Sequence, residues 1–180
     1  MPNTLEKKVA VITGGSRGIG FSIAEAMLRE GASVVISGTS NDHLDAAKTN
    51  LASYSGRVSA VQADVRRYED VEGLMATAAR DFGGLDILIN NAGVGVFKPV
   101  AETTVEEWHR VLDTNLSGVF YGCHAAIPHM KKRGGGWIIN ISSLASKNAF
   151  VNGGVYCASK SALNAFSETL MQEVKIFFRI

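Results

Sequence analysis

The stretch VAVITGGSRGIG, residues 9–20, joins a short apolar run to a glycine-rich turn and to the start of a helix pattern. Gly14 permits a sharp turn, Gly18 lets the main chain approach an anion, and Gly20 lets helix and strand pack closely. The helix that follows begins with free N–H groups and the positive end of its dipole. The stretch therefore predicts a strand, a pyrophosphate-binding turn and a helix. The other residues expected beside the bound group are Ser16, Arg17 and Ile19.

Apolar runs and amphipathic stretches alternate along the rest of the chain. The predicted strands are Val9–Thr13, Ser33–Ser37, Val58–Ala63, Leu85–Asn90 and Trp137–Ile141. The predicted helices are Ile19–Glu30, Asp42–Ser53, Tyr68–Phe82, Val105–Lys132 and Val155–Val174. The runs are continuously apolar, as is typical of parallel strands that are covered on both faces. Strands that alternate with single crossover helices predict an α/β fold. We expect a Rossmann-like doubly wound parallel sheet with helices on both faces, in one domain over residues 1–180.

Composition excludes several classes of protein. Of the 180 residues, 46% are hydrophobic and 19% are charged, which is typical of a globular domain and not of a disordered chain. The net charge of +1 gives no electrostatic reason to expect nucleic acid or a membrane surface as a partner. Cys123 and Cys157 have no metal-ligand spacing, so we expect two buried reduced thiols and no metal. No signal core opens the chain and no apolar run approaches the ~20 residues of a membrane span, which predicts a soluble cytoplasmic protein.

The end of the second predicted strand indicates which dinucleotide the turn would bind. A fold of this type commonly places an acid there to hold the ribose hydroxyls of NAD. Here the residues from Ile36 to Ser40 include no carboxylate, and Thr39 is expected to contact the cofactor instead. Arg17 lies in the glycine turn, where a guanidinium can pair with a 2′-phosphate through two hydrogen bonds. These features favour NADP(H). The alternative is that Arg17 is only a solvated loop residue.

Tyr156 and Lys160 are spaced to share one helix face, and Ser143 lies thirteen residues before the tyrosine. Side chains four residues apart on a helix lie roughly 5–6 Å from each other at their β-carbons. A cation beside a phenol favours the phenolate and moves the group toward the range in which acid–base catalysis is efficient. A serine hydroxyl at the same place would hold a substrate oxygen. Tyr-x-x-x-Lys alone is a weak signal, but the three groups together would move a proton on or off a carbonyl or an alcohol.

Six separated motifs resemble those of the short-chain dehydrogenase/reductase family, in its order and at its spacing, over nearly the whole chain. They are Thr13-Gly-x-x-x-Gly-x-Gly20, Asp64, Asn90-Asn91-Ala92-Gly93, Asn115, Ser143 and Tyr156-x-x-x-Lys160. Within the family the resemblance is strongest to bacterial 3-oxoacyl-(acyl carrier protein) reductases. It implies an NADP(H)-dependent oxidoreductase that interconverts a carbonyl and a secondary alcohol, with hydride transfer from the nicotinamide.

The resemblance also implies roles for single residues. Tyr156 would exchange a proton with the substrate oxygen, while Lys160 would promote ionisation of the phenol and hold the nicotinamide ribose. Ser143, selected over Ser142 by the thirteen-residue spacing, would orient the substrate oxygen. Asn115 would belong to a proton relay and kink its helix around a water. The residues implied along the cofactor are Asp64, which would hydrogen-bond the adenine, and Val65, Asn91, Ala92 and Gly93.

The expected partners are a small-molecule carbonyl or alcohol, or an acyl carrier thioester, and a second copy of the chain. Lys131-Lys132-Arg133 would receive an acidic carrier protein, or is simply the solvated end of a helix. In the resembled family the helices Val105–Lys132 and Val155–Val174 flank a two-fold interface, which implies a homodimer or a higher homo-oligomer. The apolar residues expected to face outward there are Leu112, Val119, Leu163 and Phe166.

The C-terminus departs from the family pattern. Family members continue with a sixth strand, a Pro-Gly turn, a segment that covers the substrate and a seventh strand, whereas this sequence ends at Ile180. This departure predicts that the last strands are missing, that Trp137–Ile141 is an exposed edge strand, and that apolar surface is exposed around Ile176–Ile180. The alternative function is therefore a truncated, catalytically weak or inactive nucleotide-binding module.

Overall fold

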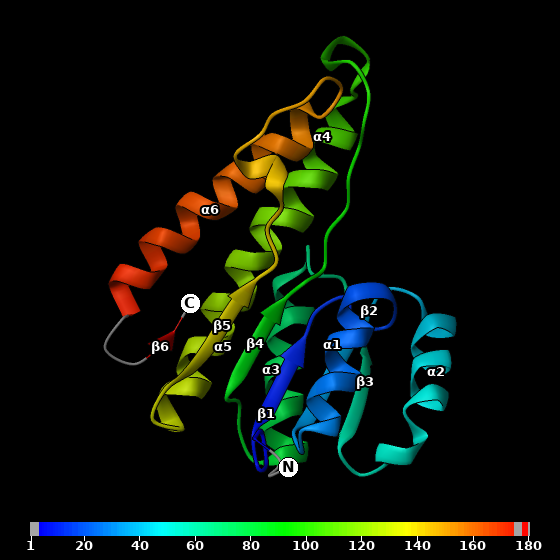
Figure 1. Cartoon of the computed structure of the whole chain (residues 1–180), viewed down its shortest axis with the longest axis vertical. Helices are drawn as coiled ribbons and strands as arrows, with labels where there is room; N and C mark the ends of the chain where they lie inside the picture. Colours follow the sequence, from blue (N-terminus) through cyan, green and yellow to red (C-terminus); the bar gives the residue numbers. More distant parts are fainter. Residues whose placement is uncertain (1–3, 175–177, 180) are drawn as a thin grey trace.

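The computed structural model describes residues 4–174 and 178–179, in which a parallel sheet lies between layers of helices (Figure 1). The strands are β1 Val9–Ile12, β2 Ser33–Gly38, β3 Val58–Gln62, β4 Ile87–Asn90, β5 Gly136–Asn140 and β6 Phe178–Arg179. The helices are α1 Gly18–Arg29, α2 Asn41–Asn50, α3 Tyr68–Phe82, α4 Val105–Leu112, α5 Gly118–Lys132 and α6 Gly154–Val174. Short helical turns add η1 Ala52–Tyr54, η2 Val100–Glu102, η3 Asp113–Ser117 and η4 Leu144–Ser146.

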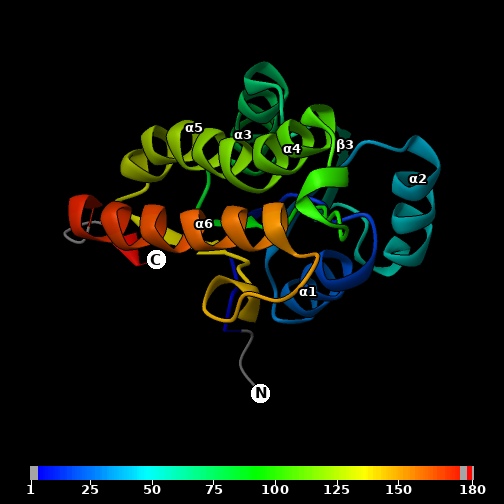
Figure 2. The same cartoon turned by 90° about the horizontal axis from the view of Figure 1, so that it is seen from above.

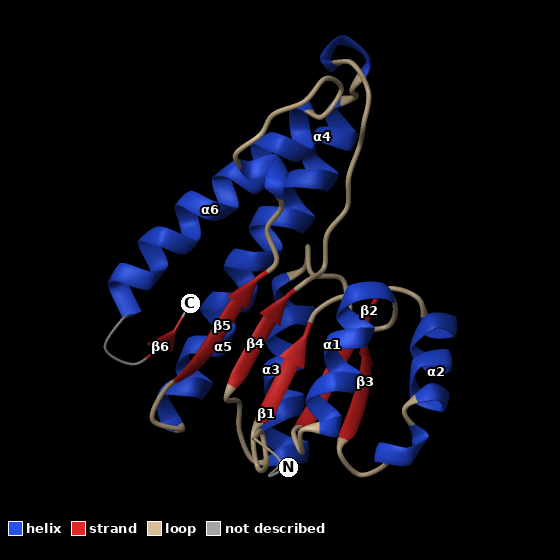
Figure 3. Cartoon of the chain, in the orientation of Figure 1, coloured by secondary structure: helices blue, strands red, loops and turns tan. Residues whose placement is uncertain are grey.

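The strand order determines at which point of the sheet a ligand would bind. The order is β3-β2-β1-β4-β5-β6, and every neighbouring pair is parallel. Figure 3 shows β1, β4 and β5 pointing the same way, toward the end from which the long loops rise. The chain reverses its direction of winding between β1 and β4, where Val11 is in register with Leu88. In an open α/β sheet, ligands bind beyond the carboxyl ends of the strands at such a switch point.

Two hydrophobic cores explain why the strands are apolar without alternation. Val9 and Val11 of β1 face a core shared with α3, α5 and α6. Ala10 and Ile12 face a second core shared with α1 and α2. Figure 2 shows α3 and α5 on one side of the molecule and α1 on the other. Because successive side chains of a strand point to opposite faces, both sets must be apolar when both faces are covered.

The predicted fold class is confirmed, and the predicted elements occur within a few residues of their expected bounds. The main difference is in the helix predicted over Val105–Lys132, which is interrupted by the π-helical segment η3. The helix predicted over Asp42–Ser53 ends at Asn50 and is followed by the 3-10 turn η1. Neither change has a periodic signature in the sequence, because segments of three and five residues are too short to show a period of their own.

The prediction that β5 is an unpaired edge is wrong at its first two residues. Gly136 and Trp137 pair in parallel with Phe178 and Arg179 of β6. An edge strand has unpaired N–H and C=O groups, which form hydrogen bonds with any extended segment that reaches them. The sequence did not predict this strand because two residues are too few to show a strand pattern. The predicted exposure of apolar side chains over Ile176–Ile180 falls on side chains outside the described part of the chain.

The prediction of outward-facing residues on the long helices is also wrong for two of the four. Val119 and Leu163 are buried in the core shared with α3, while Leu112 and Phe166 are half-buried. The exposed large apolar residues of these helices are Val105, Trp108, Phe120 and Met171. The helical period alone does not say which face meets the sheet, and tertiary packing turns Val119 and Leu163 inward.

The packing of α5 on β4 depends on a glycine. A Cβ added at Gly122 would lie 2.4 Å from the Oδ1 atom of Asn90, which is buried. The Nδ2 atom of Asn90 donates a hydrogen bond to Oδ1 of Asn140 at 2.9 Å. The side chain of Asn90 therefore cannot turn away without breaking a bond between neighbouring strands. This contact brings α5 close to the end of β4.

We expect Gly122→Ala to lower the free energy of unfolding by about 1–3 kcal/mol, because the new methyl overpacks the α5–β4 contact. The matched control is Gly73→Ala in α3, where an added Cβ would meet no atom within 4 Å. This control should raise the free energy of unfolding by about 0.5–1 kcal/mol, since alanine is the better helix former. Denaturant titration of both variants measures the difference. Equal stability of the two would refute the packing of α5 against Asn90.

Candidate functional site

The turn after β1 forms the floor of the site. Gly14 and Gly18 have φ angles of +63° and +57°, a left-handed conformation that other residues rarely adopt. Gly20 is required for a different reason, because a Cβ there would lie 2.4 Å from the carbonyl oxygen of Gly14. Arg17, which precedes α1, provides no side-chain cap for the helix. The first N–H groups of α1 are thus left for an anion.

Thr13 and Asn91 tie this turn to the loop after β4. The Oγ1 atom of Thr13 accepts hydrogen bonds from the main-chain N–H groups of Asn91 at 3.0 Å and Ala92 at 3.1 Å. In return, Nδ2 of Asn91 donates to the carbonyl oxygens of Thr13 at 3.0 Å and Gly14 at 3.1 Å. The amide of Asn91 therefore holds the turn in shape. Thr13 was not predicted as a site residue, although its place at the head of the glycine motif was a signal.

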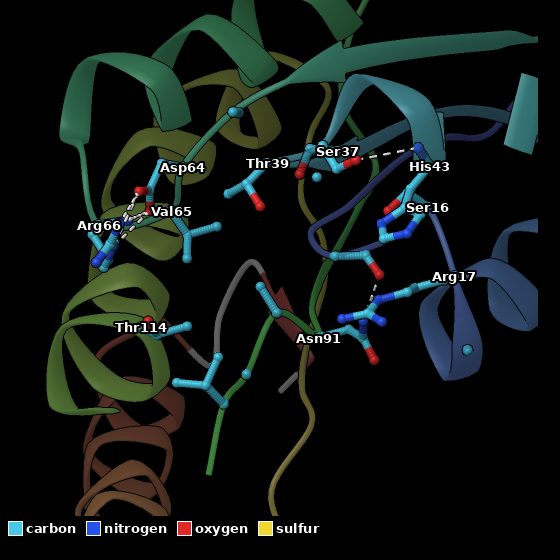
Figure 4. A pocket seen from close by; sticks show the side chains of 18 of the residues that line it. Ser16, Arg17, Ser37, Thr39, His43, Asp64, Val65, Arg66, Asn91 and Thr114 are labelled. Atoms are coloured by element: carbon cyan, nitrogen blue, oxygen red, sulfur yellow. Dashed lines mark hydrogen bonds and ion pairs between the residues drawn. The ribbon is translucent and has the colours of Figure 1, made fainter. Parts of the chain in front are cut away.

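A cavity of about 680 Å³ opens above the turn at the switch point (Figure 4). The predicted residues in its wall are Gly14, Ser16, Arg17, Gly18, Ile19, Thr39, Asp64, Val65, Asn91, Ala92 and Gly93. The predicted Gly20 lies buried beneath the turn and is not part of the wall. The wall residues that sequence reasoning missed are Ser37, Gly38, Ser40, His43, Ala63, Arg66, Val94, Arg110 and Thr114. Most of these flank predicted positions, as Thr114 of η3 flanks Asn115, but His43 of α2 and Arg110 of α4 flank none.

Asp64 is paired with a cation inside this wall. The Nε atom of Arg66 donates to both carboxylate oxygens of Asp64 at 3.0 Å, and Figure 4 shows the two side chains turned toward each other. The hydrogen bonds from Arg66 hold the pKa of Asp64 below its usual range. Asp70 accepts a hydrogen bond from the main-chain N–H of Asp64 at 2.9 Å, which fixes the loop after β3. Asp64 therefore presents an ionised carboxylate at the cavity.

In contrast to the loop after β3, the end of β2 carries no charged side chain. The wall there consists of Ser37, Gly38, Thr39 and Ser40, with no carboxylate, and the exposed Arg17 lies across from it in the same cavity. The Oγ atom of Ser37 is buried and finds no hydrogen-bond partner in the part of the chain that the structure describes. A buried hydroxyl without a partner is unfavourable, so a polar ligand atom at this place would satisfy it.

Tyr156 and Lys160 come together on α6 as their spacing predicts. The Nζ atom of Lys160 lies 6.0 Å from the centre of the Tyr156 ring and donates a hydrogen bond of 2.7 Å to the carbonyl oxygen of Ile141. Lys160 is only 5% exposed, and this burial lowers its pKa. The carbonyl of Ile141, directly after β5, thus sets the position of the ammonium beside the phenol.

Asn115 lies in the π-helical segment η3 and is completely buried. Its Oδ1 atom accepts a hydrogen bond from the N–H of Val94, and its Nδ2 atom donates to the carbonyl of Val94, both at 2.9 Å. Nδ2 also donates to Oγ of Ser159 at 3.0 Å, and that hydroxyl donates to the carbonyl of Tyr156 at 2.8 Å. Asn115 therefore joins the loop after β4 to the helix that carries the phenol. Such π-helical segments occur frequently at functional sites.

The two adjacent serines differ in their contacts. The hydroxyl of Ser142 donates a hydrogen bond of 2.6 Å to Oδ1 of Asn164. The Oγ atom of Ser143 accepts a hydrogen bond of 3.1 Å from the N–H of Ala145 and begins the turn η4. Over residues 4–174 the hydroxyl hydrogen of Ser143 has no acceptor, whereas that of Ser142 is used. The contacts thus leave Ser143 as the available donor of the pair.

The cavity and the Tyr156–Lys160 pair meet at Gly93. Ser143, Tyr156 and Lys160 lie outside the cavity wall, which ends at Gly93 and Val94. A Cβ at Gly93 would be 3.9 Å from Nζ of Lys160 and 3.4 Å from Oδ1 of Asn115. An extended ligand that runs from the glycine turn along Gly93 would therefore reach the ammonium and the phenol.

Other kinds of site receive no support from the described residues. Within them, no group of three His, Cys, Asp or Glu side chains has a metal-binding arrangement. Cys123 and Cys157 are buried and unpaired, as predicted, and burial raises the pKa of Cys123 to about 12. Among the helices of this part of the chain, none combines the length and apolar character of a membrane span.

Comparison with known proteins gives relatives over almost the whole chain. The family model for short chain dehydrogenases matches residues 8–177. An uncharacterised oxidoreductase of Methylorubrum extorquens is 42% identical over 171 residues, which covers 94% of this chain and 68% of that protein. An uncharacterised oxidoreductase of Staphylococcus saprophyticus is 37% identical over 174 residues, which covers 97% of this chain and 70% of that protein.

Solved structures agree in fold and in the extent of the match. A short-chain dehydrogenase/reductase from Brucella melitensis, named glucose/ribitol dehydrogenase, has a TM-score of 0.94 at 34% identity and covers 100% of this chain and 75% of that one. A short chain dehydrogenase/reductase from Burkholderia phymatum, in complex with NAD, has a TM-score of 0.93 at 29% identity, with coverage of 98% and 64%. The chain thus spans 64% to 75% of the length of these four proteins. With a family match from residue 8 to residue 177, the chain belongs to the short-chain dehydrogenase family of oxidoreductases.

Proposed function

We propose that the chain is an NADP(H)-dependent oxidoreductase that interconverts a carbonyl compound and a secondary alcohol. The observation that carries this proposal is the Tyr156–Lys160 pair beside Gly93, at the end of a cavity whose floor suits a phosphate-bearing ligand. The pair supplies an acid beside a cation, and the cavity supplies room for a dinucleotide that ends there.

The wall of the cavity fits the parts of a dinucleotide. The pyrophosphate would lie at the N-terminus of α1, where Gly18 brings the main chain close and the N–H groups are free. The adenine would lie against Val65, with the ionised Asp64 accepting a hydrogen bond from its amino group. The orphaned hydroxyl of Ser37 would gain a partner from the adenosine part. The remaining residues proposed along the cofactor are Gly14, Ser16, Ile19, Asn91, Ala92 and Gly93. Gly20 would serve the cofactor indirectly, because it shapes the turn from beneath.

The relative from Burkholderia phymatum holds NAD, so it does not support a preference for NADP. We propose this preference from residues of this chain alone. An acid after β2 would repel the 2′-phosphate of NADP, and the wall from Ser37 to Ser40 contains none. Arg17 is exposed to the cavity and free to pair with the phosphate, with Thr39 as a second polar contact. The absence of an acid and the presence of Arg17 both favour a doubly charged 2′-phosphate at the β2 end of the cavity.

The residues beyond Gly93 would perform the proton transfer. When bound, the reduced nicotinamide supplies a hydride to the carbonyl carbon. Tyr156 donates its phenolic proton to the carbonyl oxygen, so that the C=O group becomes CH–OH, and in the reverse direction it takes this proton back. Ser143 donates a hydrogen bond to the same oxygen, and Lys160 stabilises the phenolate and holds the ribose. Asn115 keeps Val94 and Ser159 in place around the phenol, and its part in a proton relay remains a prediction.

A homodimer through α4, α5 and α6 belongs to the same proposal. These helices expose Trp108, Phe120 and Met171. Exposed large apolar side chains on neighbouring helices suit a self-complementary two-fold contact. An acyl carrier thioester is the second candidate substrate of the same site.

Arg17→Ala is expected to weaken NADPH binding about ten- to a hundredfold, since a charge-assisted hydrogen bond to phosphate contributes roughly 1.5–3 kcal/mol. NADH binding should stay within about twofold of the original value, because NADH has no 2′-phosphate. The control is Arg29→Ala, which removes the same charge from the other end of α1, where Arg29 pairs with Glu25. Fluorescence titration of both cofactors measures the dissociation constants. A wild-type chain that binds NADH and NADPH equally would overturn the assignment.

Tyr156→Phe should reduce carbonyl turnover by a factor of roughly 10²–10⁴ while leaving the dissociation constant of NADPH within about twofold. The phenol acts on the proton and not on the dinucleotide. Lys160→Met should impair both quantities, because the ammonium serves the phenol and the ribose. The control is Tyr121→Phe, since Tyr121 packs against Tyr68 and Phe120 outside the site. Stopped-flow measurement of NADPH oxidation gives the turnover, and a parallel cofactor titration gives the dissociation constant.

Two outcomes would contradict the proposed chemistry. Retention of most turnover by Tyr156→Phe would require another acid. Binding without turnover in the wild type would favour the nucleotide-binding module.

Sedimentation should show a dimer that Trp108→Glu together with Met171→Glu converts to a monomer, because a buried unpaired charge is strongly unfavourable at an apolar contact. Glu72→Lys, which changes the charge of an exposed residue on α3, a helix outside the proposed contact, is the control and should remain dimeric. A monomeric wild-type chain at high micromolar concentration would contradict the proposed interface.

A further inference from the structure

Two exposed phenylalanine rings extend in a row from the phenol of Tyr156. The ring of Phe97 lies 5.4 Å from that of Tyr156, at an interplanar angle of 65°. The ring of Phe150 lies 6.0 Å from that of Phe97, at an angle of 33°. Phe97 is 60% exposed and Phe150 is 49% exposed. The three rings form a continuous aromatic row with the phenol at one end.

Two glycines make room for these rings. A Cβ added at Gly95 would lie 2.7 Å from Cζ of Phe97, and one added at Gly153 would lie 2.6 Å from Cε2 of Phe150. Each ring therefore rests on main chain that has no side chain of its own. Each ring thus packs one side against main chain and presents the other to solvent.

The aromatic row lies on the side of the phenol away from the glycine turn. Gly93, at the end of the cavity, is beside Lys160, whereas a Cβ at Gly95 would be 3.5 Å from Cδ2 of Tyr156. Phe97 follows along the same loop. A cofactor that reaches the phenol past Gly93 would thus leave the Phe97 side open for the other reactant.

The segments that carry the row also expose large apolar side chains and contain no acid. Val100, Leu144 and Val151 come from the same segments and are among the most exposed large apolar residues of the described chain. The ammonium of Lys98, the residue directly after Phe97, is paired with Glu107 at 2.8 Å. The two segments, residues 94–100 and 141–153, contain no carboxylate, and their only other charged residue is Lys147. This wall would therefore desolvate an apolar group at little polar cost.

We propose that Phe97 and Phe150 determine the substrate class, and that this class is carbonyl compounds with an aryl group next to the carbonyl, and the matching benzylic alcohols. The inference rests on the proposed carbonyl reduction at Tyr156. A phenyl ring beside the carbonyl would stack or pack edge-on against the Phe97 ring while the carbonyl oxygen reaches the phenol. A substrate with several hydroxyl groups would lose hydrogen bonds to water at this wall without replacing them.

The experiment measures binding apart from turnover. The dissociation constants of 1-phenylethanone and 1-cyclohexylethanone are compared by ligand-observed NMR, with and without NADP⁺, which cannot reduce either ketone. The aryl ketone should bind roughly three- to tenfold more tightly than the cyclohexyl ketone. Phe97→Ala and Phe150→Ala should each weaken aryl ketone binding by a similar factor. Trp137→Ala is the control, because Trp137 is an exposed aromatic near the amino end of β5, about 13 Å along the strand from Ile141.

A second variant removes any ambiguity from misfolding. Phe97→Leu keeps an apolar side chain over Gly95 and should keep the thermal unfolding midpoint, while it loses the preference for the aryl ketone. Equal binding of the two ketones by the wild type, or an unchanged preference in Phe97→Leu, overturns the inference. So does tighter binding of dihydroxyacetone or of a 3-oxobutanoyl thioester than of the aryl ketone. Binding of the aryl ketone that depends on Phe97 but is followed by no reduction with NADPH supports this inference and refutes the proposed reaction.

Discussion

The hydrogen bonds between Thr13 and Asn91 are the contact on which the whole site depends. β1 and β4 are neighbours whose following segments leave the sheet in different directions, so nothing in the strands themselves sets the width of the crevice between them. The Asn91 side chain bridges this crevice by donating to the carbonyls of Thr13 and Gly14. The same amide also explains Gly20, since a Cβ there would lie 2.5 Å from Nδ2 of Asn91. One side chain thus fixes the turn, the start of α1 and the loop after β4.

The reactive end is held by a second set of buried bonds. Lys160 reaches the carbonyl after β5, and Asn115 joins the loop after β4 to α6. Buried polar groups of this kind are stable only when they are paired, so the phenol between them has a defined position. The polarity of the site changes along its length. It runs from Arg17 and the Asp64–Arg66 pair at one end to the exposed rings of Phe97 and Phe150 at the other.

Much of the fold and of the site was predictable because it is encoded by short-range patterns. Continuous apolar runs identified the strands, although only β1, β2 and β4 are mostly buried while β3 and β5 are partly exposed. The left-handed φ of Gly14 and Gly18 explains why glycine stands at both positions. A spacing of four residues placed Lys160 beside Tyr156 on one helix face. The π-helical turn at Asn115 and the strand β6 were not predictable in the same way. Each depends on partners distant in the sequence, namely Val94 and Ser159 for the asparagine and β5 for the strand.

The sequence by itself thus determined the alternation of strands and helices, the glycine turn and the identity of the acid–cation pair, since local sterics and helical spacing decide these. Only the tertiary structure decided that Arg110 and Thr114 complete the cavity wall, and that Ser142 is occupied by Asn164 while Ser143 is available. It also turned Val119 and Leu163 into the core and set Phe97 against Tyr156. The physical reason is that side-chain partners far apart in the sequence meet only after the sheet order and the packing of helices on the sheet are set.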